Sequence, residues 1–343
     1  MKRRLTWQIP FLLALIIGTV WIIRQQQSMP YQHDEGFIFG TVYHVTYQSD
    51  KDLQPAIEAE LQKVDDALSM FNNRSTIARI NRGESPDLSD VPMFTDVFKL
   101  AEETSRETGG AFDITVAPLV NEWGFGFKRG VPPTKQVIDS LRQLVNYQHV
   151  QLVEHNGALY IRKTNPHIML DCSAIAKGYG SDVVARFFRK NDIQNFMIEI
   201  GGEIVTSGLN DKHAPWKIGI TKPRNDSLNI NQDIQTILNV TDKAMATSGN
   251  YRNFYYKNGK KYAHTIDPKT GYPVQHNILS STVLSNSCAK ADAYATAFMV
   301  LGLDKAKGIL DRHPDLMAYF IYADKNGKNQ VWYSPNLKKE IAK

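Results

Sequence analysis

Apolar residues recur along this chain at two spacings, which separate the expected helices from the expected strands. Apolar residues at every third or fourth position predict helices over 55–71, 91–108, 134–144 and 176–190. Alternation of apolar and polar residues, and short apolar runs bounded by glycine, predict strands. These strands cover 37–48, 196–200, 205–208, 217–221, 237–240, 244–247, 317–322 and 330–333, with further hairpins over 150–161 and 251–264.

The order of these elements indicates the fold class. Strands and helices follow one another without the strict alternation of a parallel α/β protein. The Asn156-Gly157 and Asn258-Gly259 pairs are typical of tight hairpin turns, which join antiparallel strands. The sequence therefore predicts an α+β fold with mixed or antiparallel sheets and packed helices.

The first 24 residues form a separate segment. Lys2, Arg3 and Arg4 precede an apolar run from Trp7 to Ile23, which is near the lower length limit for a membrane span. Because no small-x-small cleavage site follows, we expect an uncleaved single-pass anchor with its positive end inside and the body outside the cytoplasm. A cleaved signal peptide is the alternative. We expect a polar linker over 25–36 and one domain over 37–343.

The composition narrows the class of protein. The chain has 343 residues, of which 42% are hydrophobic, enough for a large core. The net charge of +5 is small and scattered, which argues against nucleic-acid binding. The two cysteines, Cys172 and Cys288, lack metal-ligand spacing. Cys172 reads as a small apolar residue and not as a nucleophile.

Asp292 and Thr296 are the most informative pair of residues. They lie four residues apart in an alanine-rich stretch that reads as a helix, capped by Asn286 or Ser287 and ended by Gly302. This spacing places both oxygen-bearing side chains on one face. A carboxylate in an apolar helix needs a partner, and a hard cation such as Mg²⁺ would satisfy it. The alternative is structural, with both side chains bonded to nearby backbone.

Lys177 lies where a strand ending at Asp171 runs into a helix. The free N–H groups of a helix start favour anions. A lysine there opposes the helix dipole, which makes most sense if an anion binds. A surface lysine is the alternative. Glycine pairs at Gly109-Gly110 and Gly201-Gly202 permit close approach of a ligand or form plain turns.

His264 precedes a polar turn, Asp267 to Gly271. A histidine titrates near neutral pH and could act as a base. The alternative is a structural histidine whose hydrogen bonds are satisfied within the fold.

Together these segments resemble the ApbE family of FAD:protein flavin mononucleotide (FMN) transferases. The resemblance runs from about Phe39 to Ser334, and the run from Thr247 to Pro273 is very specific. The matching strings are 39–41, 68–81, 110–126, 171–182, 201–202, 247–252, 264–273 and 291–302. The implied fold is ApbE-like and related to the T-fold.

The resemblance also implies roles for individual residues. Mg²⁺ would be held by the backbone carbonyl of Ala174 and by the side chains of Asp292 and Thr296. His264 falls in the active-site region of the family. Phe39 stands where methionine is frequent, and Phe71 where tyrosine is common. The implied FAD contacts are Phe39, Phe71, Ala111, Phe112, Asp113, Asp171, Lys177 and Ile266.

The implied reaction is the transfer of FMN from FAD to a threonine or serine hydroxyl of an acceptor protein, with release of AMP. The implied acceptors are subunits of membrane redox complexes, of the Na⁺-translocating NADH:quinone reductase or RNF type. The resemblance thus implies an anchor in the bacterial inner membrane, with the catalytic domain on the periplasmic side. Two alternatives stay open: a Mg²⁺-dependent FAD pyrophosphatase that gives FMN and AMP, and an FAD-binding protein without turnover.

Overall fold

One long antiparallel sheet organises the computed structural model, which describes residues 8–20, 29–127, 132–223, 233–251, 253–257, 259–275 and 277–342. Within these residues the sheet has eight strands in the order β1-β2-β5-β6-β9-β12-β13-β14. The strands are β1 (Tyr31–Ile38), β2 (Thr41–Gln48), β5 (Phe196–Ile200), β6 (Glu203–Ser207), β9 (Ala244–Gly249), β12 (Ile278–Ser285), β13 (Met317–Ala323) and β14 (Asn329–Tyr333). Separate hairpins are β3 (Val150–His155) with β4 (Ala158–Lys163), β7 (Lys217–Thr221) with β8 (Ile234–Asn239), and β10 (Phe254–Lys257) with β11 (Lys260–Ala263).

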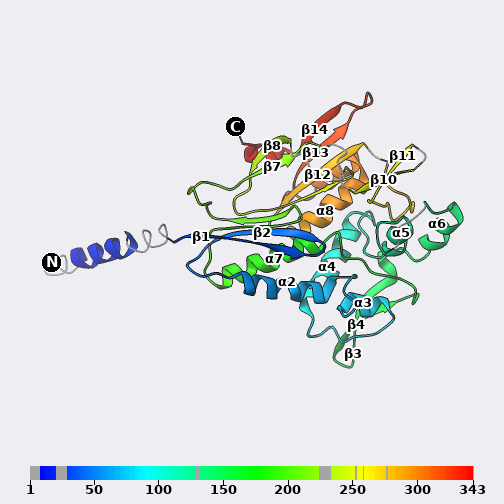
Figure 1. Cartoon of the computed structure of the whole chain (residues 1–343), viewed down its shortest axis with the longest axis horizontal. Helices are drawn as coiled ribbons and strands as arrows, with labels where there is room; N and C mark the ends of the chain where they lie inside the picture. Colours follow the sequence, from blue (N-terminus) through cyan, green and yellow to red (C-terminus); the bar gives the residue numbers. More distant parts are fainter. Residues whose placement is uncertain are drawn as a thin grey trace.

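Two layers of helices cover one face of this sheet (Figure 1). Helices α7 (Ala176–Lys190) and α8 (Cys288–Leu301) lie directly on the strands, and α2 (Gln54–Leu68) and α4 (Pro92–Glu107) pack against them from outside. Further helices of the body are α3 (Thr76–Asn81), α5 (Ala117–Glu122), α6 (Lys135–Arg142), α9 (Leu303–Leu310) and two 3₁₀ helices, Tyr147–His149 and Pro335–Glu340. The expected α+β class with antiparallel sheets is confirmed.

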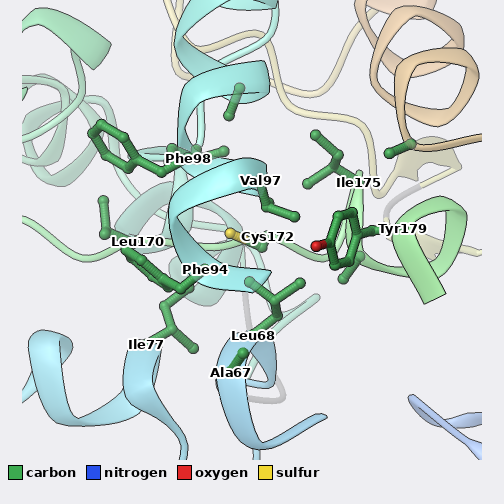
Figure 2. Packing of buried hydrophobic residues seen from close by; sticks show 14 of the residues in the cluster. Ala67, Leu68, Ile77, Phe94, Val97, Phe98, Leu170, Cys172, Ile175 and Tyr179 are labelled. Carbon is green, nitrogen blue, oxygen red and sulfur yellow. The ribbon is translucent and has the colours of Figure 1, made fainter. Parts of the chain in front are cut away.

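A large apolar cluster joins the two helical layers. Figure 2 shows Leu68 of α2, Phe94 and Phe98 of α4, and Tyr179 of α7 gathered around the sulfur of Cys172. Both cysteines are free and buried, and burial raises the pKa of the Cys172 thiol. Cys172 is therefore an apolar packing residue, as the sequence predicted.

Helix α8 is buried on almost all sides because it lies between the sheet and the outer helices. Its first turn is fixed by Asp182 of α7, whose carboxylate accepts the Ser287 hydroxyl at 2.8 Å and the N–H groups of Cys288 and Ala289 at 2.9 and 3.0 Å. Ser287 is the N-cap, and Gly302 ends the helix at φ 77°. The caps at Ser287 and Gly302 are local, as the sequence indicates, whereas Asp182 adds a contact from α7 that the sequence does not reveal.

The predicted linker and the first predicted strand need correction. Residues 31–36 form most of β1, an edge strand paired along its length with β2. The turn between the two strands is Phe39 at φ 51° and Gly40 at φ 75°, so 37–48 is a hairpin and not one strand. Two features hid this: β1 is polar, because one of its faces is exposed, and a phenylalanine with positive φ is uncommon.

Two further strands differ from expectation. β12, an interior strand of the sheet, was missed because Ser280, Ser281 and Thr282 interrupt its apolar pattern, although all three are buried. β8 was expected in the main sheet but pairs with β7 in a separate two-stranded sheet. Leu238 of β8 packs with Met245 of β9 and Leu284 of β12, so this hairpin covers the sheet face opposite the helices.

The predicted anchor is only partly described. Residues 8–20 form a helix, while 1–7 and 21–28, which include the rest of the anchor and the start of the predicted linker, lie outside the described residues. In the part of the chain that the structure describes, no helix has both the length and the apolar character needed to cross a membrane.

The close approach of α7 to α8 can be tested with an alanine at Gly178. A Cβ there would lie 2.4 Å from the Cys288 carbonyl oxygen and 2.9 Å from the Ala289 Cα. Such overpacking costs about 1–3 kcal/mol, so we expect Gly178→Ala to lower the free energy of unfolding by that amount in urea titrations. Gly308→Ala is the control, because a Cβ in that helix meets nothing within 4 Å. Equal effects of the two substitutions would contradict the contact.

Candidate active site

Helix α8 carries a buried carboxylate to the start of α7. Asp292 is 2% exposed, and its Oδ2 accepts the Gly178 N–H at 3.2 Å. The Nζ of Lys177 lies 4.0 Å from the same oxygen. Among the described residues this carboxylate accepts no other hydrogen bond, although its two oxygens offer about four acceptor positions. Asp292 is therefore a buried carboxylate that uses only part of its hydrogen-bonding capacity.

Glu203, the first residue of β6, supplies a second buried carboxylate. Its Oε2 lies 2.8 Å from the Nζ of Lys177, and its side chain is 3% exposed. Its backbone carbonyl accepts the Ser181 hydroxyl at 3.1 Å, which ties β6 to α7. Lys177 thus lies between two carboxylates. These two protein side chains offset the unfavourable interaction of its positive charge with the helix dipole.

Burial and the neighbouring charges shift the pKa values of all three groups. Desolvation raises the pKa of Glu203 to about 8 and raises that of Asp292, while the Lys177 ammonium opposes both shifts. Burial alone would lower the pKa of Lys177, but the charges of Asp292 and Glu203 raise it above its usual value. Lys177 stays charged at neutral pH, and a further cation would favour the ionised forms of both carboxylates.

The carbonyl of Ala174 lies one helical turn before Gly178. In a regular helix this carbonyl would accept the Gly178 N–H, which instead donates to Asp292. No backbone N–H among the described residues donates to the Ala174 carbonyl. The Gly178 amide is thus taken by Asp292, and the Ala174 carbonyl is left without a backbone donor.

Thr296 faces the sheet, and among the described residues its hydroxyl makes no hydrogen bond to its own helix. Its hydroxyl lies 3.1 Å from the Ser248 hydroxyl of β9. In the part of the chain that is described, no group of three or more His, Cys, Asp or Glu side chains is arranged to hold a metal ion. A cation here would instead depend on a carbonyl, a carboxylate and a hydroxyl, the hard oxygen donors that Mg²⁺ takes.

Two predicted FAD contacts are aromatic. The ring of Phe39 rests on α7, since a Cβ at Gly180 would lie 2.6 Å from it. Phe71 is 62% exposed and packs on Phe127 with 5.1 Å between ring centroids. Phe71 is therefore open to a flat ligand, whereas Phe39 is held against the helix.

Ala111, Phe112 and Asp113 form a buried turn after α4. The carboxylate of Asp113 accepts the Thr115 N–H and hydroxyl at 2.8 and 2.6 Å and the Tyr147 N–H at 2.8 Å. Burial raises the pKa of Asp113, and these bonds oppose the shift. A cavity of about 400 Å³ opens beside this turn, with Asp113, Tyr147 and Lys269 in its wall.

Asp171 is joined to the same turn. Its N–H donates to the Ile114 carbonyl at 2.7 Å, and its Oδ1 accepts the Ser173 N–H at 2.7 Å. Burial raises the pKa of Asp171, and the hydrogen bonds from Ser173 oppose that shift. The segment from Asp171 to Ala174 therefore connects the Asp113 turn to the start of α7.

His264 is half-buried at the end of β11. Its Nδ1 lies 3.2 Å from the Asn253 carbonyl, and the ring meets Phe125 edge-on at 6.4 Å. Burial lowers the pKa of His264, the Asn253 carbonyl opposes this, and the charge of Lys177 lowers it further. The neighbouring Ile266 is buried and pairs with Pro273. His264 is therefore neutral at neutral pH, the form in which it can accept a proton.

Only some of the predicted site residues contact one another in the structure. Lys177, Asp292 and the start of α7 are in direct contact. No hydrogen bond, ion pair or ring contact among the described residues joins Phe71, His264 or Ile266 to them. The sequence singled out Gly201-Gly202 but gave no role to Glu203, the next residue. The available signal was an acidic residue at the start of an otherwise apolar strand.

Comparisons with known proteins give the class of this chain. A curated relative from Vibrio cholerae, "FAD:protein FMN transferase", is 38% identical over 81% of this chain and 84% of its own length. One of the same name from Escherichia coli is 32% identical over 89% and 87%. The solved flavin transferase ApbE from Vibrio cholerae has a TM-score of 0.80 at 34% identity and covers 91% of this chain and 99% of its own.

The protein is thus an enzyme of the transferase class. Its apo neighbour from Pseudomonas stutzeri, a flavinyl transferase ApbE, has a TM-score of 0.79 at 28% identity over 91% of this chain. The ApbE family model matches residues 39–320, so the chain belongs to the ApbE family. The expected ApbE-like fold is confirmed.

The pairing of Lys177 with Glu203 can be tested through stability. Lys177→Met leaves the Glu203 carboxylate buried without its cation, which typically costs about 3–5 kcal/mol. Burial already raises the pKa of Glu203 to about 8, and loss of Lys177 raises it further. In the wild type Glu203 is already protonated below about pH 8, so the two folded proteins bind different numbers of protons only above that pH. We therefore expect the deficit relative to the wild type to grow as pH rises above about 8.

Urea titrations from pH 5 to pH 9 measure this deficit. Lys177→Met with Glu203→Gln removes both charges and should recover part of the lost stability. A Lys177→Met deficit that is independent of pH, or no recovery in the double variant, would show that the two side chains are not coupled.

Proposed function

We propose that this chain transfers the FMN part of FAD to a threonine or serine hydroxyl of an acceptor protein, with Mg²⁺ as cofactor and AMP as the other product. The names of its relatives support the transferase part. One contact supports the metal part: the Gly178 N–H donates to Asp292, which leaves the Ala174 carbonyl without a backbone donor.

The residues present fit a magnesium ion. The Ala174 carbonyl, Asp292 and Thr296 would hold it, and when bound it supplies positive charge against the phosphate oxygens. Lys177 adds a fixed positive charge, because Glu203 and Asp292 keep it protonated. Phe71, exposed at its site, offers a face to one of the flat rings of FAD.

His264 would take the proton of the acceptor hydroxyl. Because a carbonyl only accepts, the Nδ1 that faces Asn253 carries the proton of the neutral ring, and Nε2 is the basic nitrogen. The hydroxyl oxygen forms a bond to the phosphorus on the riboflavin side. The bond from that phosphorus to the bridging oxygen breaks, and AMP leaves with the electron pair.

The acceptors we propose are flavoprotein subunits of membrane redox complexes, of the Na⁺-translocating NADH:quinone reductase or RNF type. The apolar run after Lys2, Arg3 and Arg4 supports a membrane anchor with the catalytic domain on the periplasmic side. Such tethering would hold the enzyme near targets in the same membrane.

Asp292 tests the metal assignment. Asp292→Ala should abolish Mg²⁺-dependent AMP release from FAD and acceptor labelling, read as a fluorescent protein band on a denaturing gel. The fold should persist, because Lys177 keeps Glu203 as its partner. Asp304→Ala, at an exposed aspartate of α9, is the control. Wild-type turnover of Asp292→Ala, or turnover with a chelator present, would overturn the assignment.

The same assay separates transfer from hydrolysis. Transfer requires AMP release to depend on the acceptor protein and on its hydroxyl-bearing residue. Equal AMP release without acceptor, and no fluorescent band, would identify a pyrophosphatase instead.

His264 tests the proton transfer. A general base contributes about 10²–10⁴-fold, so His264→Ala should lower the transfer rate by that factor. The wild-type rate should fall on the acidic side as His264 becomes protonated, at a pH below the ordinary histidine pKa because burial lowers it. His264→Ala should lose this limb, whereas His155→Ala, at an exposed histidine of β3, should keep it. An unchanged rate and pH profile would exclude the role.

A further inference from the structure

Strands β9 and β12 place a pair of serines beneath α8. Ser248 of β9 and Ser281 of β12 are direct partners in the antiparallel register. On the same face of these strands, Ala246 and Val283 pack with residues of α8. Because side chains alternate between the two faces of a strand, Ser248 and Ser281 both face α8.

The two hydroxyls differ in their partners. The Ser248 hydroxyl lies 3.1 Å from that of Thr296. Ser281 is 0% exposed, and its Oγ has no hydrogen-bond partner among the described residues. A buried hydroxyl without a hydrogen-bond partner lowers the stability of the fold. Such a hydroxyl usually binds a water molecule or an ion.

We propose that Ser281 is a further oxygen donor of the cation site, binding a water molecule of the ion's hydration shell. This rests on the proposed function, in which Ala174, Asp292 and Thr296 hold the ion. Mg²⁺ needs six oxygens and usually keeps several waters, so three protein ligands leave positions for water. Ser281 lies one strand beyond Ser248, because the Cβ atoms of cross-strand partners are about 4.5–5.5 Å apart. A water molecule can span that additional distance.

Ser280 provides a matched control. It lies next to Ser281 on the same strand, is also 0% exposed, and its Oγ also lacks a partner. Alternation places it on the opposite face, with Leu284, which packs against the β7–β8 side. Ser280→Ala and Ser281→Ala therefore delete the same buried group from the same strand and differ only in the face.

The experiment measures Mn²⁺ binding to the full chain in detergent, without FAD, from the electron paramagnetic resonance signal of free Mn²⁺. Loss of an outer-shell partner typically weakens metal binding about 10–100-fold, and we expect Ser281→Ala to fall in that range. Ser280→Ala should bind Mn²⁺ as the wild type does. Urea titrations without metal should show similar stability for the two variants.

The outcomes separate this inference from the proposed function. Asp292→Ala should lose the Mn²⁺ site. If it does and Ser281→Ala binds like Ser280→Ala, the role of Ser281 is wrong while the metal site stands. If Asp292→Ala binds Mn²⁺ normally, the metal site itself is wrong, and the role of Ser281 is overturned with it.

Discussion

The contact between the first turns of α7 and α8 is the constraint on which the rest of the site depends. It requires a residue without a side chain at Gly178, because any Cβ would meet the backbone of Cys288 and Ala289. It also requires Asp182, which reaches from α7 to cap the start of α8. With the helices this close, Asp292 competes for the Gly178 N–H, and the carbonyl one turn earlier loses its donor.

The electrostatics of the site follow from that packing. Two buried carboxylates share one partly buried ammonium, so the negative charge is in excess by one when all three are ionised. Burial of carboxylates with too little positive charge raises their pKa values, as for Glu203 and Asp292. A divalent cation reverses this imbalance, and the phosphates of an anionic substrate would then restore a near-neutral interior.

A short aromatic loop after α5 connects the outlying parts of the site. Trp123 donates its Nε1–H to the Gly271 carbonyl at 2.8 Å, which anchors the loop that follows His264. Two residues on, Phe125 meets His264, and two residues further, Phe127 packs on Phe71. This alternation gives His264 and Phe71 fixed neighbours although neither contacts the carboxylate cluster directly.

The sequence by itself determined the local features and the residue types. The α+β class, most helices and the caps of α8 follow from periodicity and from Ser287 and Gly302, because these signals are local in the chain. It also supplied the Asp292 and Thr296 pair, since an i,i+4 spacing fixes a shared helix face. Tertiary structure decided the placement of β1 and β12, whose polar residues gain their role only from neighbouring strands. It likewise decided that Glu203 pairs with Lys177 and that Ser281 faces α8, because residues far apart in sequence meet only once the helices pack on the sheet.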